Sequence, residues 1–156
     1  MSADLLDAWR NHEGVAVEDG LRAWRYDELR AEVDALADSW QAQGVRVLAT
    51  LMDNGAAWIA ADLAALRAGI VHLPLPGFFT PAQIGHALRA AGADALLAAP
   101  QAAAAFAPLP STAVELMGQP LAWLRLPAQP VAMPAGTVKI TFTSGTTGTP
   151  KGVCLG

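Results

Sequence analysis

The sequence predicts an α/β fold: a partial doubly wound, mainly parallel sheet with helices on both faces. Strand-like and helix-like patterns alternate between residues 45 and 98, and glycines follow the helix-like patterns. The order strand, helix, strand, helix, strand favours right-handed crossovers and a parallel sheet. The 156 residues, 53% hydrophobic and 15% charged, are sufficient for one packed core. We therefore expect residues 1–156 to form a single α/β (sub)domain.

Two helices and a hairpin are predicted before residue 45. Ser2 is expected to cap a short helix over residues 3–10. Strands over residues 15–18 and 21–24 flank Asp19-Gly20, a dipeptide typical of hairpin turns. Asp27 is expected to cap the next helix, which ends before Gly44. That helix has one apolar stripe, formed by Leu29, Val33, Leu36, Ala37 and Trp40.

The central segment predicts three strands separated by two helices. Residues 45–51 are mostly apolar, which indicates a strand buried on both faces. Asp53 or Asn54 is expected to cap the following helix, and Thr80-Pro81 places a cap and an N1 proline before the next. The other predicted elements are helices over residues 56–68 and 81–91 and strands over residues 70–73 and 95–98.

Residues 100–135 predict an irregular, proline-rich segment. Its prolines divide it into short pieces. Residues 101–107 favour a helix, and residues 112–117 and 121–126 favour strands at the edge of the sheet.

The segment from residue 138 to residue 153 has the strongest functional pattern. Residues 138–143 form a β-branched run typical of a strand, and residues 144–150 include no large side chain. Small residues leave backbone N–H groups open, glycines allow a concave backbone, and hydroxyls add donors. Lys151 adds a point charge of the kind that binds phosphate. These features predict a site for a polyphosphate anion; the alternative is a flexible tail rich in glycine and threonine.

The same segment resembles a known family signature. It differs from a Walker A loop because Pro150 precedes Lys151 and no Ser or Thr follows it. Residues 142–153 resemble the adenylate-forming (AMP-binding) superfamily pattern aromatic-x-Ser-Gly-Thr-Thr-Gly-x-Pro-Lys-Gly-Val. Residues 24–29 and 66–75 also look like family elements, with Arg25 in place of a hydroxyl residue. The resemblance implies phosphate binding by Thr143, Ser144, Gly145, Thr146, Thr147, Gly148 and Lys151.

The resemblance also implies an activity, that of an ATP-dependent acid–thiol ligase. Such enzymes join a carboxylic acid to AMP, using ATP with Mg2+, and pass the acyl group to a thiol of CoA or of a phosphopantetheine carrier. The family places its adenine pocket, its magnesium-binding glutamate and a mobile C-terminal lid domain after this loop. We therefore expect an N-terminal fragment that is itself inactive and contains no catalytic residue. A stand-alone interaction or regulatory module and a simple phosphate-binding module are the alternatives.

Composition excludes several other classes. The net charge of −4 gives no reason to expect nucleic acid as a partner. The most hydrophobic segment, residues 56–73, contains Asp62 and Arg67, so no membrane span is predicted. The single cysteine, Cys154, is expected to be buried and suits a reducing, cytoplasmic location. The three histidines lack the spacing of a metal site, so satisfied or surface roles are expected. Apolar surface left exposed predicts self-association.

Overall fold

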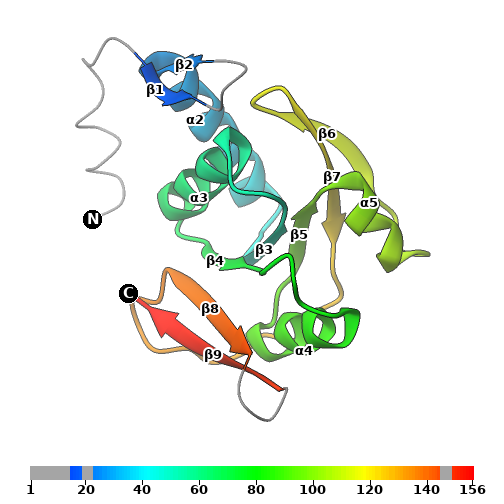
Figure 1. Cartoon of the computed structure of the whole chain (residues 1–156). Coiled ribbons are helices and arrows are strands. Elements are labelled where there is room, and N and C mark those ends of the chain that lie inside the picture. The colour runs from blue at the N-terminus through cyan, green and yellow to red at the C-terminus, as the bar shows by residue number, and fades with distance from the viewer. Residues whose placement is uncertain (1–14, 19–22, 145–148) are drawn as a thin grey trace.

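The computed structural model describes residues 15–18, 23–144 and 149–156, and a seven-stranded sheet organises most of them (Figure 1). In space the strands follow the order β6-β7-β5-β3-β4-β8-β9. Their bounds are β3 (Val47–Leu51), β4 (Val71–Pro74), β5 (Ala95–Ala98), β6 (Thr112–Leu116), β7 (Gln119–Arg125), β8 (Lys139–Ser144) and β9 (Pro150–Leu155). Strands β5, β3, β4 and β8 are parallel neighbours, and antiparallel strands extend the sheet at both ends. The predicted fold class is confirmed.

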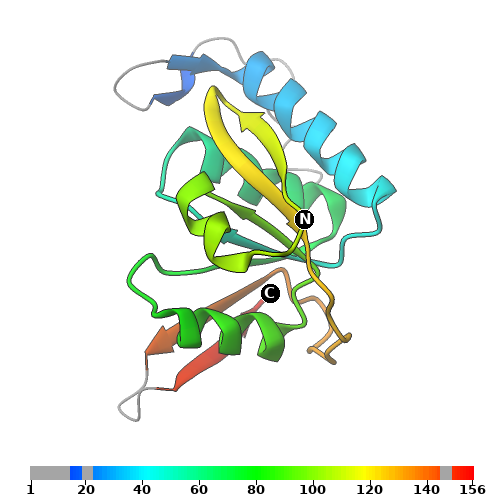
Figure 2. The same cartoon turned by 90° about the vertical axis from the view of Figure 1, so that its right-hand side faces the viewer.

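Helices cover both faces of this sheet (Figure 2). One face packs against α2 (Tyr26–Ala42) and α3 (Ala56–Ala68). The other packs against α4 (Pro81–Ala91), the short α5 (Pro100–Ala103) and the 3-10 turn η1 (Ala104–Phe106). A small hairpin, β1 (Val15–Glu18) with β2 (Ala23–Arg25), precedes α2. Strand β1 has the predicted bounds, and β2 ends at Arg25, one residue beyond the predicted strand. The expected turn and the expected helix over residues 3–10 lie outside the described residues.

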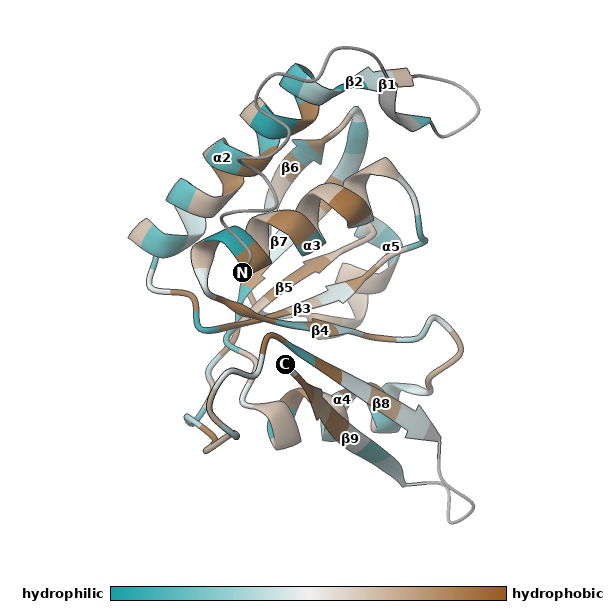
Figure 3. Cartoon of the chain, turned by 90° about the vertical axis from the view of Figure 1, so that its left-hand side faces the viewer, coloured by the Kyte–Doolittle hydropathy of each residue, from teal (hydrophilic) through white to brown (hydrophobic). Residues whose placement is uncertain are grey.

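Burial follows from the apolar patterns. Every residue of β3 is buried, as the mostly apolar sequence predicted. Helix α2 shows alternating hydrophilic and hydrophobic bands, whereas α3 is largely apolar (Figure 3). The buried surface of α3 consists of small side chains, which allow α2 and the sheet to approach closely on either side. Those side chains are Ala56, Ala57, Ala60, Ala61, Ala64 and Ala65.

The start of α4 was predicted correctly. Thr80 is its N-cap and accepts a hydrogen bond from the Gln83 backbone N–H at 3.2 Å. The Gln83 side chain accepts in return from the Thr80 N–H at 2.9 Å. This reciprocal capping box satisfies two donors at the helix start. At the other end Gly92 is left-handed, with φ 66°, as expected of a terminating glycine.

The predicted caps of the other two helices were wrong. Asp27 lies in the first turn of α2, because β2 runs to Arg25, which is the N-cap. The N-cap of α3 is Gly55, which has no side chain to cap with, so Asp53 and Asn54 lie outside the helix and do not cap it. Helix capping therefore does not account for these two polar residues.

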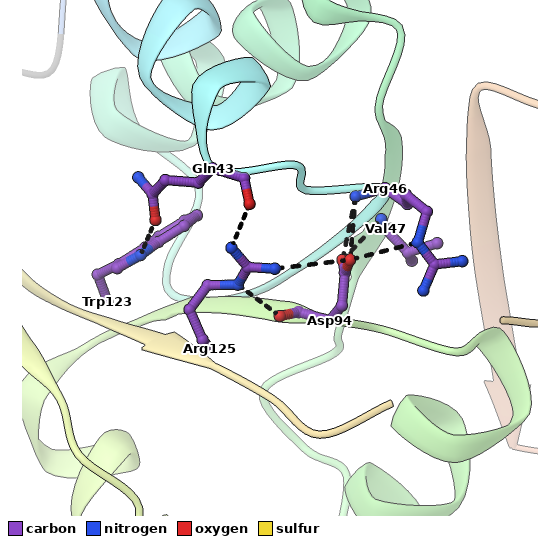
Figure 4. A network of polar contacts seen from close by, with 6 residues as sticks. All are labelled: Gln43, Arg46, Val47, Asp94, Trp123 and Arg125. Atoms are coloured by element: carbon purple, nitrogen blue, oxygen red, sulfur yellow. Dashed lines mark hydrogen bonds and ion pairs between the residues drawn. The ribbon is translucent and has the colours of Figure 1, made fainter. Parts of the chain in front are cut away.

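At the amino ends of β3 and β5, Asp94 ties four elements together (Figure 4). Its side chain accepts hydrogen bonds from the backbone N–H groups of Arg46 at 3.1 Å and Val47 at 3.0 Å. Arg125 of β7 donates through Nε to the Asp94 carbonyl at 3.1 Å. The same guanidinium donates to the Gln43 carbonyl, after the end of α2, at 2.7 Å. Polar contacts thus stabilise the amino ends of these strands.

The structure bears on three further expectations from the sequence. The segment over residues 100–135 does hold a short helix, α5, and the edge hairpin β6–β7. Cys154 is exposed, which corrects the expectation of a buried thiol, because β9 is the edge strand and most of its residues face solvent. Within the described residues, no helix combines the length and apolarity that a membrane crossing requires.

Candidate functional site

The hairpin β8–β9 carries the predicted phosphate-binding residues. Strand β8 ends at Ser144 and β9 begins at Pro150, and these two residues pair. Gly145, Thr146, Thr147 and Gly148 lie outside the described residues. Thr143 is paired directly with Lys151, and both are exposed. Directly opposed residues on antiparallel strands share a face, so the hairpin brings a hydroxyl and an ammonium group together at the base of the loop.

The opposite face of the hairpin explains the glycine after Lys151. Phe142 pairs with Gly152, and the Phe142 side chain is buried, with 8% exposure. A Cβ added to Gly152 would lie 2.8 Å from Phe142 Cζ, closer than real contacts allow. The aromatic ring therefore occupies the space over the glycine. The sequence matched Gly152 only to the family pattern, and this contact gives it a packing role.

The other end of β8 is held by a polar cluster. Lys139, the first residue of β8, places Nζ 3.0 Å from Oδ1 of Asp62 on α3. His72 of β4 places Nδ1 2.7 Å from the same oxygen. Burial alone would raise the pKa of the Asp62 carboxyl. The hydrogen bonds from His72 and Lys139, and the electrostatic attraction between the carboxylate and these two side chains, outweigh burial, so the pKa of Asp62 is lowered and the carboxylate is favoured.

His72 is satisfied on both ring nitrogens, one of the two roles expected for the histidines. Its Nε2 lies 2.8 Å from Thr50 Oγ1, and Trp58 packs at 5.5 Å between ring centroids. The order Thr50–His72–Asp62 is that of a nucleophile, base and acid. However, Thr50 and His72 are each only 1% exposed, so no substrate reaches the hydroxyl. Among the described residues, no group of His, Cys, Asp or Glu is placed to hold a metal ion.

A cleft of about 670 Å3 opens beside the hairpin, at the carboxyl ends of the parallel strands. Asp53 and Asn54, which follow β3, line it together with Trp58 of α3. Thr141 and Phe142 of β8 form its border with the hairpin. In open α/β sheets, ligands bind outside the carboxyl ends of the strands. The cleft and the exposed base of the loop therefore form one candidate binding region.

Comparison with known proteins decides the family. The sequence model of the AMP-binding enzyme family matches residues 7–156. The chain belongs to this family. The chain is 36% identical over 162 residues to phosphinothricin tripeptide synthetase PhsC of Streptomyces viridochromogenes, covering 97% of the chain and 15% of PhsC. It is 32% identical over 155 residues to a feruloyl-CoA synthase of an Amycolatopsis species, covering 90% of the chain and 30% of the synthase.

A solved structure with the same fold is O-succinylbenzoate coenzyme A synthetase (MenE) of Bacillus subtilis in complex with AMP. The TM-score is 0.69 at 20% identity, over 96% of this chain and 40% of the MenE chain. At this identity the likeness supports the fold alone. In each of these comparisons, the chain spans less than half of the protein that it matches.

Proposed function

We propose that this chain is the N-terminal, phosphate-binding part of an ATP-dependent acid–thiol ligase. The observation that carries the proposal is the β8–β9 hairpin, whose strands place Thr143 and Lys151 side by side at an open end. Family membership supports adenylate chemistry, and the cleft beside the hairpin offers space for a ligand. The remaining parts of the large domain and a C-terminal lid domain are supplied outside these residues.

In the proposed reaction, a carboxylate oxygen of the acid attacks the α-phosphorus of ATP, which is bound with Mg2+. A P–O bond forms, the bond to the β-phosphate oxygen breaks, and pyrophosphate leaves with its electron pair. The thiol then loses its proton to solvent, and its sulfur attacks the acyl carbon. The bond from that carbon to the phosphate oxygen breaks, AMP leaves with the electron pair, and a thioester results. The thiol belongs to CoA or to a carrier phosphopantetheine arm, and a thioester-formation assay with each thiol separates the two.

This chain's contribution is to bind the leaving pyrophosphate. The hydroxyls of Ser144, Thr146 and Thr147 and the N–H groups of Gly145 and Gly148 are proposed to hold the β- and γ-phosphates. Thr143 and Lys151 complete the set from the strands that flank the loop. Fixed donors at the leaving group stabilise the charge that develops there and hold it in line with the attacking oxygen.

The isolated 156 residues are proposed to be inactive. Charge-assisted hydrogen bonds contribute about 1.5–3 kcal/mol each. Two of them give about 4 kcal/mol, which corresponds to a Kd in the millimolar range. Exposed apolar side chains on the edge strand β9, Val153 and Leu155, are proposed to make the isolated chain self-associate. A concentration-dependent mass in analytical ultracentrifugation tests this.

The test of function is ATP–pyrophosphate exchange by the complete protein that carries this chain, over a panel of carboxylic acids. We expect acid-dependent exchange that falls at least about tenfold in Lys151→Ala, since one charge-assisted bond is worth about 1.5–3 kcal/mol. The matched control is Arg89→Ala, which removes an exposed cation in the last turn of α4 and leaves exchange unchanged. ATP binding without exchange for any acid would instead favour a non-catalytic phosphate-binding module.

A further inference from the structure

The hairpin that carries the loop is attached to the rest of the sheet near its base. The pairing of β4 with β8 joins His72 to Lys139, the first residue of β8. The His72 N–H also donates to the Val138 carbonyl at 3.0 Å. From there β8 continues beyond the end of this pairing toward the loop, and the hairpin extends past β4 beside α4 (Figure 1). The direction of β8 is therefore set where it leaves β4.

Asp62 connects three elements at this point. One of its carboxylate oxygens lies 2.7 Å from His72 Nδ1 and 3.0 Å from Lys139 Nζ. The side chains of Asp62 and Lys139 are 26% and 27% exposed, so the pair is partly shielded from water. Trp58 limits the freedom of the lysine further, because the Lys139 ammonium lies 5.3 Å from the centre of the indole ring. One carboxylate thus fixes α3, β4 and the start of β8 together.

We propose that Asp62 is a positioning residue for nucleotide binding, acting through Lys139 and His72 on the orientation of the β8–β9 hairpin. This inference rests on the proposed function. Thr143 is four residues beyond Lys139, which at about 3.3 Å per residue is about 13 Å along the strand. A tilt of about 10° at the base moves Thr143 by about 2 Å, whereas binding groups must be held within about 0.5 Å.

The opposite face of the hairpin keeps it folded when the Asp62 contact is lost. Ile140 and Phe142 are buried in the apolar cluster that also contains residues of α4. His86 of α4 packs edge-on against the Phe142 ring at 6.3 Å. These contacts retain the hairpin on α4 but leave its α3 side without its charged anchor. Loss of Asp62 therefore changes the orientation of the hairpin, but the hairpin remains folded against α4.

The test compares Asp62→Asn with Asp34→Asn in the complete protein. Asp34 forms an ion pair of 2.8 Å with Arg67 that joins α2 to α3, with side chains 37% and 28% exposed. This pair is close in exposure to Asp62–Lys139 and does not touch the hairpin. We expect Asp62→Asn to raise the KM for ATP about tenfold, the equivalent of about 1.4 kcal/mol, and to leave the KM for the acid within about twofold. Asp34→Asn leaves both constants unchanged.

Lys139→Met supplies a second, independent variant. It removes the other partner of the same contact, so it raises the KM for ATP like Asp62→Asn. The double variant is no worse than Asp62→Asn alone, because Asp62→Asn already removes the ion pair that Lys139→Met removes. If Asp62→Asn fails to fold, Lys139→Met alone decides. An unchanged KM for ATP, or equal rises in the KM of ATP and acid, overturns the inference. Absence of ATP-dependent exchange in the unaltered protein overturns the proposed function instead.

Discussion

Replacing Gly152 by alanine tests the packing at the base of the loop. The new Cβ would lie 2.8 Å from Phe142 Cζ and 3.1 Å from both Cε atoms. The Phe142 ring is buried among the side chains under α4, so it has little room to move away. Either the ring leaves its rotamer or the two strands separate at this pair. Both responses cost free energy because the added methyl group overpacks the site.

The expected cost follows from two opposing effects. Extra methyl groups forced into a packed site cost about 1–3 kcal/mol. Alanine also restricts the unfolded chain, which stabilises the protein by about 0.4–1 kcal/mol. The net destabilisation is therefore about 1–2 kcal/mol. For a domain of this size, about 2–4 °C is lost per kcal/mol, so Tm falls by roughly 2–8 °C.

Thermal unfolding followed by circular dichroism measures this shift. Gly77→Ala is the matched control, because Gly77 has no atom within 4 Å of the added Cβ, and its Tm stays within about 2 °C of the unaltered chain. Adding Phe142→Leu to Gly152→Ala removes the clash, so the double variant loses less stability than the two single changes sum to. Equal Tm values for Gly152→Ala and Gly77→Ala would refute the argument that the ring requires a glycine.

Three further outcomes are expected. Asp94→Ala leaves the Arg46 and Val47 N–H groups without their acceptor and costs about 2–5 kcal/mol, measured as a fall in the urea midpoint. Thr80→Ala removes the cap of α4 and costs about 1 kcal/mol, measured in the same way; an unchanged midpoint would show that Gln83 alone supports the helix start. Asp62 has a pKa below its ordinary 3.8, so its contribution is present above that pH and lost as pH falls through the folded-state pKa. The stability difference between the unaltered chain and Asp62→Asn is therefore largest near neutral pH and shrinks below about pH 4; a constant difference would contradict the lowered pKa.

Local signals in the sequence predicted the elements that depend on local structure. Thr80-Pro81 and Gly92 bound α4 as expected, since a cap and a left-handed glycine act within one turn. Asp27 is a good cap type, but β2 runs up to the start of α2 and Arg25 takes the N-cap position. Asp53 is also a good cap type, but α3 begins only after Gly55. A strand that runs directly into a helix, as β2 does into α2, leaves no position for such a cap.

Properties that depend on distant residues were not predicted. Cys154 is exposed because β9 lies at the edge of the sheet, which the apolar pattern of that strand does not reveal. The contact of Asp62 with His72 and Lys139 joins a helix and two strands. A signal was present, since Asp62 interrupts an apolar helix and His72 an apolar strand. From the sequence alone, we used Asp62 only to exclude a membrane-spanning helix.

The amino ends and the carboxyl ends of the parallel strands differ in a way that supports the proposed location of the binding site. At the amino ends of the strands, Asp94 accepts hydrogen bonds from backbone N–H groups and Arg125 donates to backbone carbonyls, so polarity there serves stability. At the carboxyl ends, no side-chain hydrogen bond within the described ranges involves Asp53 or Asn54 of the cleft, or Thr143 or Lys151 of the hairpin. Polar side chains that have no such partner in the part of the chain that the structure describes are available to a ligand. A ligand that binds at the carboxyl ends of the strands therefore leaves the polar contacts at their amino ends intact.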